Sequence, residues 1–164
     1  MSSLNKTNLH NLRKMVCEAN INLVKNKLVI LTWGNASAVD RDNDLMIIKP
    51  SGVPYEQLTP NKMVILKIST GEVVNKQSLL PSSDAPTHLA LYRKYGEINS
   101  IIHTHSPYAT AFAQANKKIV SLGTTHADYF YGDILCTRKM TKAEIQQNYE
   151  YNTGKVIIEM LSKN

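Results

Sequence analysis

The stretch LVILTWGNASAVDRDNDLMIIK, residues 28–49, decides the fold class of this chain. It holds short runs of apolar and β-branched residues, which predict strands, interrupted by the turn-forming segments Trp33-Gly34-Asn35 and Asp42-Asn43-Asp44. These turns are too short for the crossover connection that parallel strands need, so the pattern predicts antiparallel neighbours. The strands expected in this stretch are residues 28–32, 37–39 and 45–49.

Predicted helices and further strands lie on both sides of this stretch. In residues 7–27 apolar positions recur at helical spacing, and near the other end Thr141 with Glu144 has the spacing of a capping box. Single helices that alternate with antiparallel strands predict an α/β fold with helices on both faces of the sheet. Further helices are expected at 86–94, 106–115 and 141–161, a hairpin at 63–74, and strands at 100–105 and 119–122.

The length of 164 residues matches one ordinary domain, and 43% hydrophobic residues suffice for a core. No apolar run reaches the roughly 18 residues of a membrane span, and the first ten residues hold no apolar signal region. Cys17 and Cys136 lie far apart without metal or redox spacing, which is typical of reduced thiols. We therefore expect a cytoplasmic protein that does not contact a membrane.

The net charge is +6 and the isoelectric point is near 9.3. Lys and Arg are scattered along the chain, and no basic helix is interleaved with aromatic residues. The charge therefore favours small anionic molecules over nucleic acid as partners.

Two histidines, His103 and His105, are separated by one residue in a predicted strand. Residues i and i+2 of a strand point to the same face, about 6–7 Å apart along the strand. The spacing predicts neighbouring imidazoles, which suit an ion of the Zn, Cu, Fe, Ni or Mn type. Two histidines on one strand can instead meet only solvent or a backbone acceptor, and a firm metal site needs more ligands.

Asp84 is the candidate for a third ligand, since it precedes a predicted helix and follows two serines. The alternative is that its carboxylate only caps the first turn of that helix. His88, four residues further on, shares the helical face of Asp84. It is a second candidate ligand or hydrogen-bond partner, or an ordinary partly buried histidine.

Three turns rich in small polar residues each contain hydroxyl groups or free amides of the kind that bind phosphate. They are Gly34-Asn35, Ser51-Gly52 with Lys49 nearby, and Ser82-Ser83. Turns of this composition often do no more than reverse the chain, and on composition alone both interpretations stay open.

Asp128 lies among the aromatic and acid/base groups of residues 123–132. Aromatic surroundings raise the pKa of a carboxyl, which suits proton transfer near neutral pH. The alternative is a surface carboxylate on a packed aromatic loop.

Five motifs follow one another along the chain: residues 31–40, residues 48–53, Pro81-Ser82-Ser83-Asp84, His103-Thr104-His105-Ser106 and the run from Gly123 to Met140. Together they resemble the class II aldolase/epimerase family, and within it the L-ribulose-5-phosphate 4-epimerases. The resemblance extends from the first predicted helix to the last.

The resemblance implies one domain over residues 1–164, a three-layer α/β/α sandwich with a mostly antiparallel central sheet, and a homotetramer with active sites at subunit interfaces. It implies Zn²⁺, or another divalent metal such as Mn²⁺, held by Asp84, His103 and His105. It also implies a sugar phosphate substrate and a catalytic Asp128 that reaches a neighbouring subunit's site. The residues implied to bind substrate and phosphate are Gly34, Asn35, Lys49, Ser51, Gly52, Ser82 and Ser83.

The reaction implied is epimerisation of L-ribulose 5-phosphate to D-xylulose 5-phosphate at C4, in arabinose or ascorbate breakdown. The C3–C4 bond is cleaved by a retro-aldol step and re-formed on the other face. Family aldolases acting on fuculose or rhamnulose phosphate perform the same cleavage and release the products. They carry Ser-Ser-Glu where this chain has Ser82-Ser83-Asp84, and this difference favours the epimerase.

Chains of this family continue for several tens of residues beyond the last motif found here. The additional segment normally supplies a third metal histidine and a tyrosine that acts as the second acid/base group. We therefore expect a C-terminally truncated chain that binds metal weakly and turns over slowly or not at all. A metal-free, inactive binding domain with the same fold is the alternative.

Overall fold

The computed structural model describes residues 3–74 and 79–162. The chain divides into two compact units, Met1–His105 and Ser106–Asn164, called here the first and second unit. The assignment of residues 1–164 to one domain stays a prediction.

The first unit is built on a four-stranded sheet of order β3-β2-β1-β4, with antiparallel pairing between all neighbours. The short turn after β1 reverses the chain at Asp44, whose φ of 58° lies in the left-handed region. The prediction of antiparallel neighbours is therefore confirmed. The strands are β1 (Asn35–Asp40), β2 (Leu45–Ile48), β3 (Val64–Lys67) and β4 (Ser100–His103).

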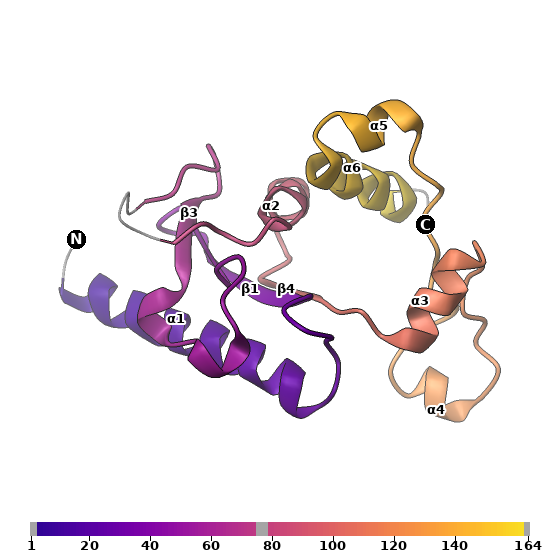
Figure 1. Ribbon diagram of the computed structural model, residues 1–164, viewed down its shortest axis with the longest axis horizontal. Helices are drawn as coiled ribbons and strands as arrows, with labels where there is room; N and C mark the ends of the chain where they lie inside the picture. Colours follow the sequence, from indigo (N-terminus) through magenta and orange to yellow (C-terminus); the bar gives the residue numbers. More distant parts are fainter. Residues whose placement is uncertain (1–2, 75–78, 163–164) are drawn as a thin grey trace. The chain divides into compact units, whose positions relative to one another are not determined.

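Helices α1 (Ser3–Lys25) and α2 (Ala85–Lys94) cover opposite faces of this sheet (Figure 1). The four residues of β2 are all buried, because alternate side chains pack against the two helices. Leu45 and Ile47 share a core with α1, whereas Met46 and Ile48 share one with α2. The predicted α/β class, with helices on both faces of an antiparallel sheet, is confirmed in this unit.

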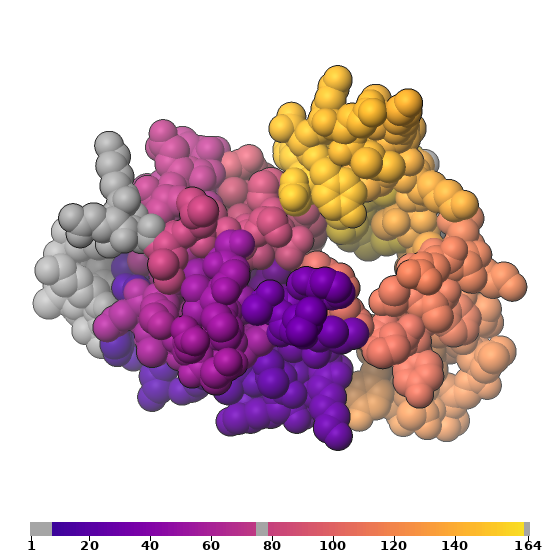
Figure 2. Space-filling model, viewed as in Figure 1, coloured from indigo at the N-terminus to yellow at the C-terminus, as the bar shows by residue number. Residues whose placement is uncertain are grey.

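Two short 3₁₀ helices, η1 (Tyr55–Gln57) and η2 (Pro60–Lys62), connect β2 to β3. Arg13 of α1 donates to the Pro60 carbonyl over 2.8 Å, which ties this connection to the helix. In the space-filling view the indigo atoms of α1 and the magenta atoms of the central segment lie against one another without a visible gap (Figure 2).

The second unit contains four helices in its described part, and only Gly154 and Val156 of these helices are buried. The predicted capping box is present, since Thr141 and Glu144 bond to each other's backbone amides. Arg138 adds ion pairs to Glu144 and Glu159. The helices are α3 (Pro107–Gln114), α4 (Thr124–Ala127), α5 (Lys142–Gln146) and α6 (Tyr149–Leu161).

Several predicted elements differ from the structure. Residues 28–32 form no strand, because residues 30–33 make a tight turn in which Leu31 has a φ of 52° and Ile30 pairs with Trp33. The helix predicted at 141–161 is interrupted at Asn148, whose φ is 54°. The strand predicted at 119–122 is reduced to one bridge between Ile119 and Ile134.

Across the part of the chain that the structure describes, no helix is both long and apolar enough to cross a membrane.

Candidate functional site

The start of β1, the end of β4 and the N-terminus of α2 meet in the first unit. In the antiparallel register the Cα atom of Asn35 is paired with that of His103. Alternate residues of β1 face α2, so the side chain of Asn35 lies beneath the first turn of this helix, where Asp84 is the N-cap residue.

The Asp84 carboxylate is the centre of this site. Its Oδ2 atom accepts hydrogen bonds from Asn35 Nδ2 over 2.7 Å and from His103 Nδ1 over 2.9 Å, and Ser82 Oγ lies 3.4 Å away. Asn35 Nδ2 also donates to Ser82 Oγ over 3.1 Å. We call Asn35, Ser82, Asp84 and His103 the Asp84 cluster. Asp84 makes no side-chain capping bond to α2, so the capping alternative is wrong.

The electrostatics of the site keep Asp84 ionised and His105 neutral near pH 7. Burial by itself would raise the pKa of the Asp84 carboxyl, but bonds from His103 and Asn35 outweigh it and the pKa lies below its ordinary value. Burial, with a contribution from His103, lowers the pKa of His105. Carboxylate and neutral imidazole are the forms that bind metals.

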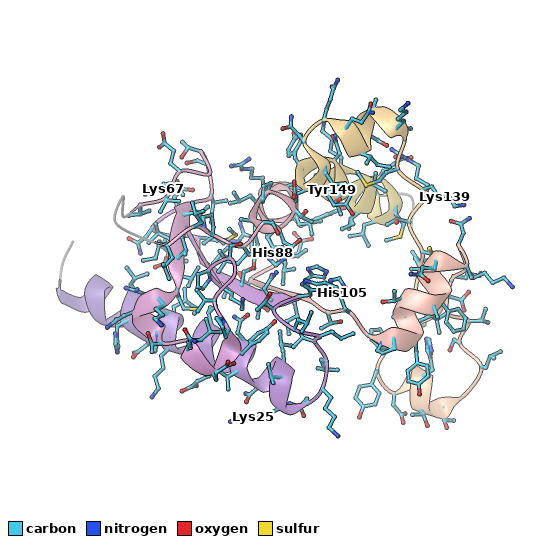
Figure 3. The ribbon with its side chains drawn as sticks, viewed as in Figure 1. Lys25, Lys67, His88, His105, Lys139 and Tyr149 are labelled. Carbon is cyan, nitrogen blue, oxygen red and sulfur yellow. The ribbon has the colours of Figure 1, made fainter. Side chains whose placement is uncertain are left out.

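His105 follows the end of β4, which stops at His103 instead of continuing to residue 105 as predicted. The two imidazole rings are nevertheless close, with centroids 4.8 Å apart. The ring centroid of Trp33, on the loop before β1, lies 5.7 Å from that of His105. Figure 3 shows the His105 side chain just beyond the end of β4. The sequence does not indicate this proximity of Trp33 to His105, because Trp33-Gly34-Asn35 predicts only a turn.

One carboxylate and two imidazoles are a donor set that suits Zn²⁺ or a similar divalent ion. In the described arrangement, however, His103 bonds to Asp84 itself. Among residues 3–74 and 79–162, no three His, Cys, Asp or Glu side chains are arranged to hold a metal ion. The donor chemistry therefore fits a divalent cation, whereas the ligand role of Asp84, His103 and His105 stays a prediction.

Two of the predicted phosphate turns lie side by side next to the Asp84 cluster. Ser51 N–H donates to the Leu80 carbonyl and Ser82 N–H to the Lys49 carbonyl, each over 2.9 Å. Beside them lies an open pocket of about 400 Å³, whose lining is mostly apolar and includes Ser51, Ser82 and Ser83.

Lys49 is a buried ammonium, with 2% of its surface exposed. Within the described residues its Nζ atom donates one hydrogen bond, to the Pro50 carbonyl over 3.2 Å, and lies 4.8 Å from the centre of the Tyr55 ring. Burial lowers the pKa of Lys49. The Tyr55 hydroxyl donates to the Gly34 carbonyl over 2.7 Å. Tyr55 therefore connects Lys49, which precedes the Ser51-Gly52 turn, to the Gly34-Asn35 turn. No pattern in the sequence indicated Tyr55.

Asp128 lies in the second unit, where it is exposed and follows the last residue of α4. In the same segment His126 Nε2 bonds to the Gly132 carbonyl over 2.7 Å and closes the aromatic loop on itself. The catalytic role of Asp128 stays a prediction.

His88 is on α2, one turn beyond Asp84, and is 1% exposed. Its Nδ1 atom lies 2.7 Å from Ser37 Oγ, so this nitrogen is occupied by a protein partner and is not open to a metal. Burial lowers the pKa of His88 to about 4, against a smaller opposing effect of the Asp84 carboxylate.

The depressed pKa of His88 predicts a loss of stability in acid. Between pH 6.5 and about 4 the unfolded histidine binds a proton and the folded one does not, so the free energy of unfolding falls as the pH falls. The expected loss from pH 7 to pH 4 is about 3 kcal/mol from this group. Urea unfolding at a series of pH values measures it. A His88→Gln chain should have a shallower slope in this window, and the exposed His10→Gln control should not. Equal slopes for all three chains would refute the prediction.

Comparison with known proteins assigns the chain to a family. Residues 14–163 match the family described as Class II Aldolase and Adducin N-terminal domain. The structure is similar to an L-fuculose 1-phosphate aldolase, with a TM-score of 0.74 and 26% identity over 94% of this chain and 69% of that one.

Two further L-fuculose 1-phosphate aldolases share the fold at lower identity. The enzyme from Thermus thermophilus aligns with a TM-score of 0.67 and 19% identity, over 92% of this chain and 71% of that one. The enzyme from Glaciozyma antarctica aligns with a TM-score of 0.62 and 18% identity, over 74% of this chain and 51% of that one. With its α1–sheet–α2 layers, the chain has the class II aldolase fold and belongs to the class II aldolase and adducin N-terminal domain family.

Proposed function

We propose that this protein is a metal-dependent enzyme that cleaves and re-forms a carbon–carbon bond of a sugar phosphate. The specific reaction proposed is epimerisation of L-ribulose 5-phosphate to D-xylulose 5-phosphate at C4. The observation that carries the proposal is the Asp84 carboxylate, bonded to His103 beside a pocket whose lining includes three serines. Family membership supports the same class of reaction.

Asp84, His103 and His105 are the residues proposed to hold Zn²⁺ or Mn²⁺, because they bring one carboxylate and two imidazoles to the same edge of the sheet. Lewis-acid stabilisation of the charge that develops on substrate oxygens during bond cleavage is the chemistry that a divalent cation supplies when bound. Asn35 Nδ2 holds the Asp84 Oδ2 atom in place by its 2.7 Å bond.

The phosphate of the substrate is proposed to bind at the two adjacent turns. The hydroxyls of Ser51, Ser82 and Ser83 donate to its oxygens, and the buried Lys49 ammonium supplies the positive charge. Gly34 and Asn35, at the start of β1, are proposed to contact the sugar. Gly52 is proposed to contact the phosphate through its backbone. A phosphate fixed here retains the cleaved fragment while its aldehyde rotates, which is what separates epimerisation from product release.

Asp128 is proposed as the acid/base group that exchanges a proton with the C4 oxygen on one face of the substrate, and a second group must serve the C4 oxygen on the opposite face after rotation. By resemblance to the family, Asp128 acts in the site of a neighbouring subunit of a homotetramer in the cytoplasm. Sedimentation velocity tests the assembly.

The surroundings of Asp84 favour the epimerase over the aldolase. Aspartate is one methylene shorter than the glutamate of the aldolases, and its Oδ2 atom already accepts from Asn35 and His103. A carboxylate with a lowered pKa is a weaker base, which is unfavourable for the proton-abstracting role of the aldolase glutamate. L-Fuculose-1-phosphate-type cleavage is the second candidate, because the chain is 26% identical to an L-fuculose 1-phosphate aldolase.

Incubation of the chain with Zn²⁺ and each sugar phosphate separates these reactions. The epimerase forms D-xylulose 5-phosphate from L-ribulose 5-phosphate without free aldehyde, whereas the aldolase releases an aldehyde from L-fuculose 1-phosphate. An Asp84→Asn chain should lose either activity, and an exposed His10→Gln control should keep it. The chain is expected to turn over slowly or not at all, so binding of each sugar phosphate is measured beside turnover. The absence of both turnover and Zn²⁺-dependent binding of either sugar phosphate would contradict the proposed function.

Removal of the Lys49 charge is expected to weaken substrate binding more than it slows turnover. A Lys49→Met chain keeps the length of the side chain but loses a charge-assisted bond, so the KM for L-ribulose 5-phosphate should rise about 10- to 100-fold. Initial-rate kinetics measure the change. Lys62→Met is the matched control, because the Lys62 ammonium is an exposed donor to the Gln57 carbonyl. An unchanged KM in Lys49→Met would exclude Lys49 from phosphate binding.

A further inference from the structure

A second hydrogen-bonded cluster lies directly behind the Asp84 cluster, and the proposed reaction does not use it. Ser37 Oγ is 2.7 Å from His88 Nδ1 and 2.8 Å from Tyr92 Oη. Ser37 is 2% exposed and the other two side chains are 1% exposed. We call these three residues the Ser37 cluster. Figure 3 shows His88 between α2 and the strands.

The Ser37 cluster lies between the same three elements as the Asp84 cluster, which are β1, β4 and α2. On β1 and α2 its residues are neighbours, on the same face, of the residues of the Asp84 cluster. Ser37 follows Asn35 by two residues on β1, and its Cα atom is paired with that of Ile101 on β4. His88 follows Asp84 by four residues on α2, and Tyr92 follows His88 by four more, so all three share one helical face. Tyr92 also bonds to the backbone of Ile101, which joins α2 to β4.

One direction of these bonds gives each of the two hydroxyl hydrogens an acceptor. Ile101 N–H donates to Tyr92 Oη, the Tyr92 hydroxyl donates to Ser37 Oγ, and the Ser37 hydroxyl donates to the unprotonated Nδ1 of His88. Each of these groups is buried, so a displacement of α2 would leave a donor or acceptor without a partner. The cluster therefore resists rotation and sliding of α2 over β1 and β4.

The position of the Asp84 carboxylate depends on the position of α2 over β1 and β4. The carboxylate makes no capping bond to its own helix, so its bonds run to other elements. The apolar contacts of α2, through Ala85 and Leu89 in the core, are non-directional, whereas hydrogen bonds require defined distances and angles. A rigid shift of α2 of a few tenths of an ångström would alter the 2.9 Å contact between Asp84 and His103 directly.

We propose that Ser37 and His88 are positioning residues that set the distance between the Asp84 carboxylate and the His103 imidazole. Through this distance they determine how well the site binds a divalent cation, an effect that rests on the proposed function. Neither residue is proposed as a ligand of the ion, because Ser37 Oγ and His88 Nδ1 bond to one another.

The test variant is Ser37→Ala, which removes one oxygen atom and with it the link between His88 and Tyr92. The probe is Co²⁺ alone, titrated into the full chain and followed by its visible absorption. We expect Ser37→Ala to lower the Co²⁺ affinity about 10-fold, the lower end of the effect of groups that support metal ligands. Tyr92→Phe keeps the bond between Ser37 and His88 and should lower the affinity less.

Asn20→Ala is the matched control for a general loss of stability. Asn20 is 0% exposed, and it bonds to both backbone groups of Ala36, on the same strand as Ser37. Its contacts run to α1, on the face of the sheet opposite α2. Asn20→Ala should therefore destabilise the fold in urea and leave the Co²⁺ affinity unchanged.

A readout without metal separates this proposal from the proposed function. Imidazole ¹H–¹⁵N spectra of the metal-free chain report the bond between His103 and Asp84, and Ser37→Ala should shift the His103 signal while Asn20→Ala should not. If the wild-type chain binds no Co²⁺, the proposed function fails and this spectrum decides the positioning role by itself. A Ser37→Ala chain with the wild-type His103 signal would overturn the proposal, as would wild-type Co²⁺ affinity in a chain that binds the ion.

Discussion

A His103→Ala chain is expected to bind Zn²⁺ at least about 100-fold more weakly than the wild-type chain and to lose its activity on sugar phosphates. Loss of a group that merely supports a ligand costs about 10- to 100-fold in affinity, and His103 is proposed to be a ligand itself. The substitution also frees Asp84 Oδ2 from its 2.9 Å partner, so a second proposed ligand loses its orientation. Equilibrium dialysis followed by metal analysis measures the change.

His10→Ala is the control for this experiment, because His10 is an exposed histidine on α1. It removes one imidazole from the chain without altering the Asp84 cluster. Equal Zn²⁺ affinity in the two variants would show that zinc binds elsewhere on the chain.

Gly34→Ala is expected to lower the free energy of unfolding by about 2–5 kcal/mol, the sum of a backbone and a packing effect. Gly34 has a φ of 97°, which strains any residue with a Cβ atom by about 1–2 kcal/mol. The added Cβ would lie 2.6 Å from Val29 Cγ1 and 2.8 Å from the His103 carbonyl oxygen, an overpacking that costs about 1–3 kcal/mol more. The Val29 side chain can turn away, but the His103 carbonyl is backbone of β4 and cannot move without displacing the site.

Gly52→Ala is a matched control for the backbone strain alone. Gly52 also has a positive φ, of 67°, but a Cβ atom there would meet nothing within 4 Å. Urea unfolding of both variants should show the larger loss in Gly34→Ala, and Zn²⁺ affinity should fall in that variant. Equal losses in the two variants would exclude the contact with His103 as the cause.

The layered α/β fold of the first unit was predictable because it depends on local signals. The turn at residues 42–44 is too short for a crossover, and alternating burial in β2 follows from a sheet covered on both faces. Leu28–Thr32 was misread because its β-branched composition suits a strand, whereas the left-handed backbone of Leu31 turns it back on itself. Nothing in the sequence indicates that Leu31 adopts a positive φ, because leucine rarely does so.

The site was predictable in its residue types but not in its contacts. Asp84 was open to two interpretations, since an aspartate before a helix is usually a cap. Only the register that pairs Asn35 with His103 shows that the carboxylate bonds across elements instead. Ser37 and Tyr92 were missed because the contacts of Ser37 with α2 span 51 or more residues of sequence. Asp128 belongs to the second unit, and its part in the chemistry rests on resemblance.

Titration of the wild-type chain with Co²⁺, followed by visible absorption, tests most directly whether Asp84, His103 and His105 bind a divalent metal. We predict saturable binding of one ion per chain, with an absorption band that disappears in a chain carrying both His103→Ala and His105→Ala. The absence of saturable binding, or the same band in the double variant, would contradict the proposed site.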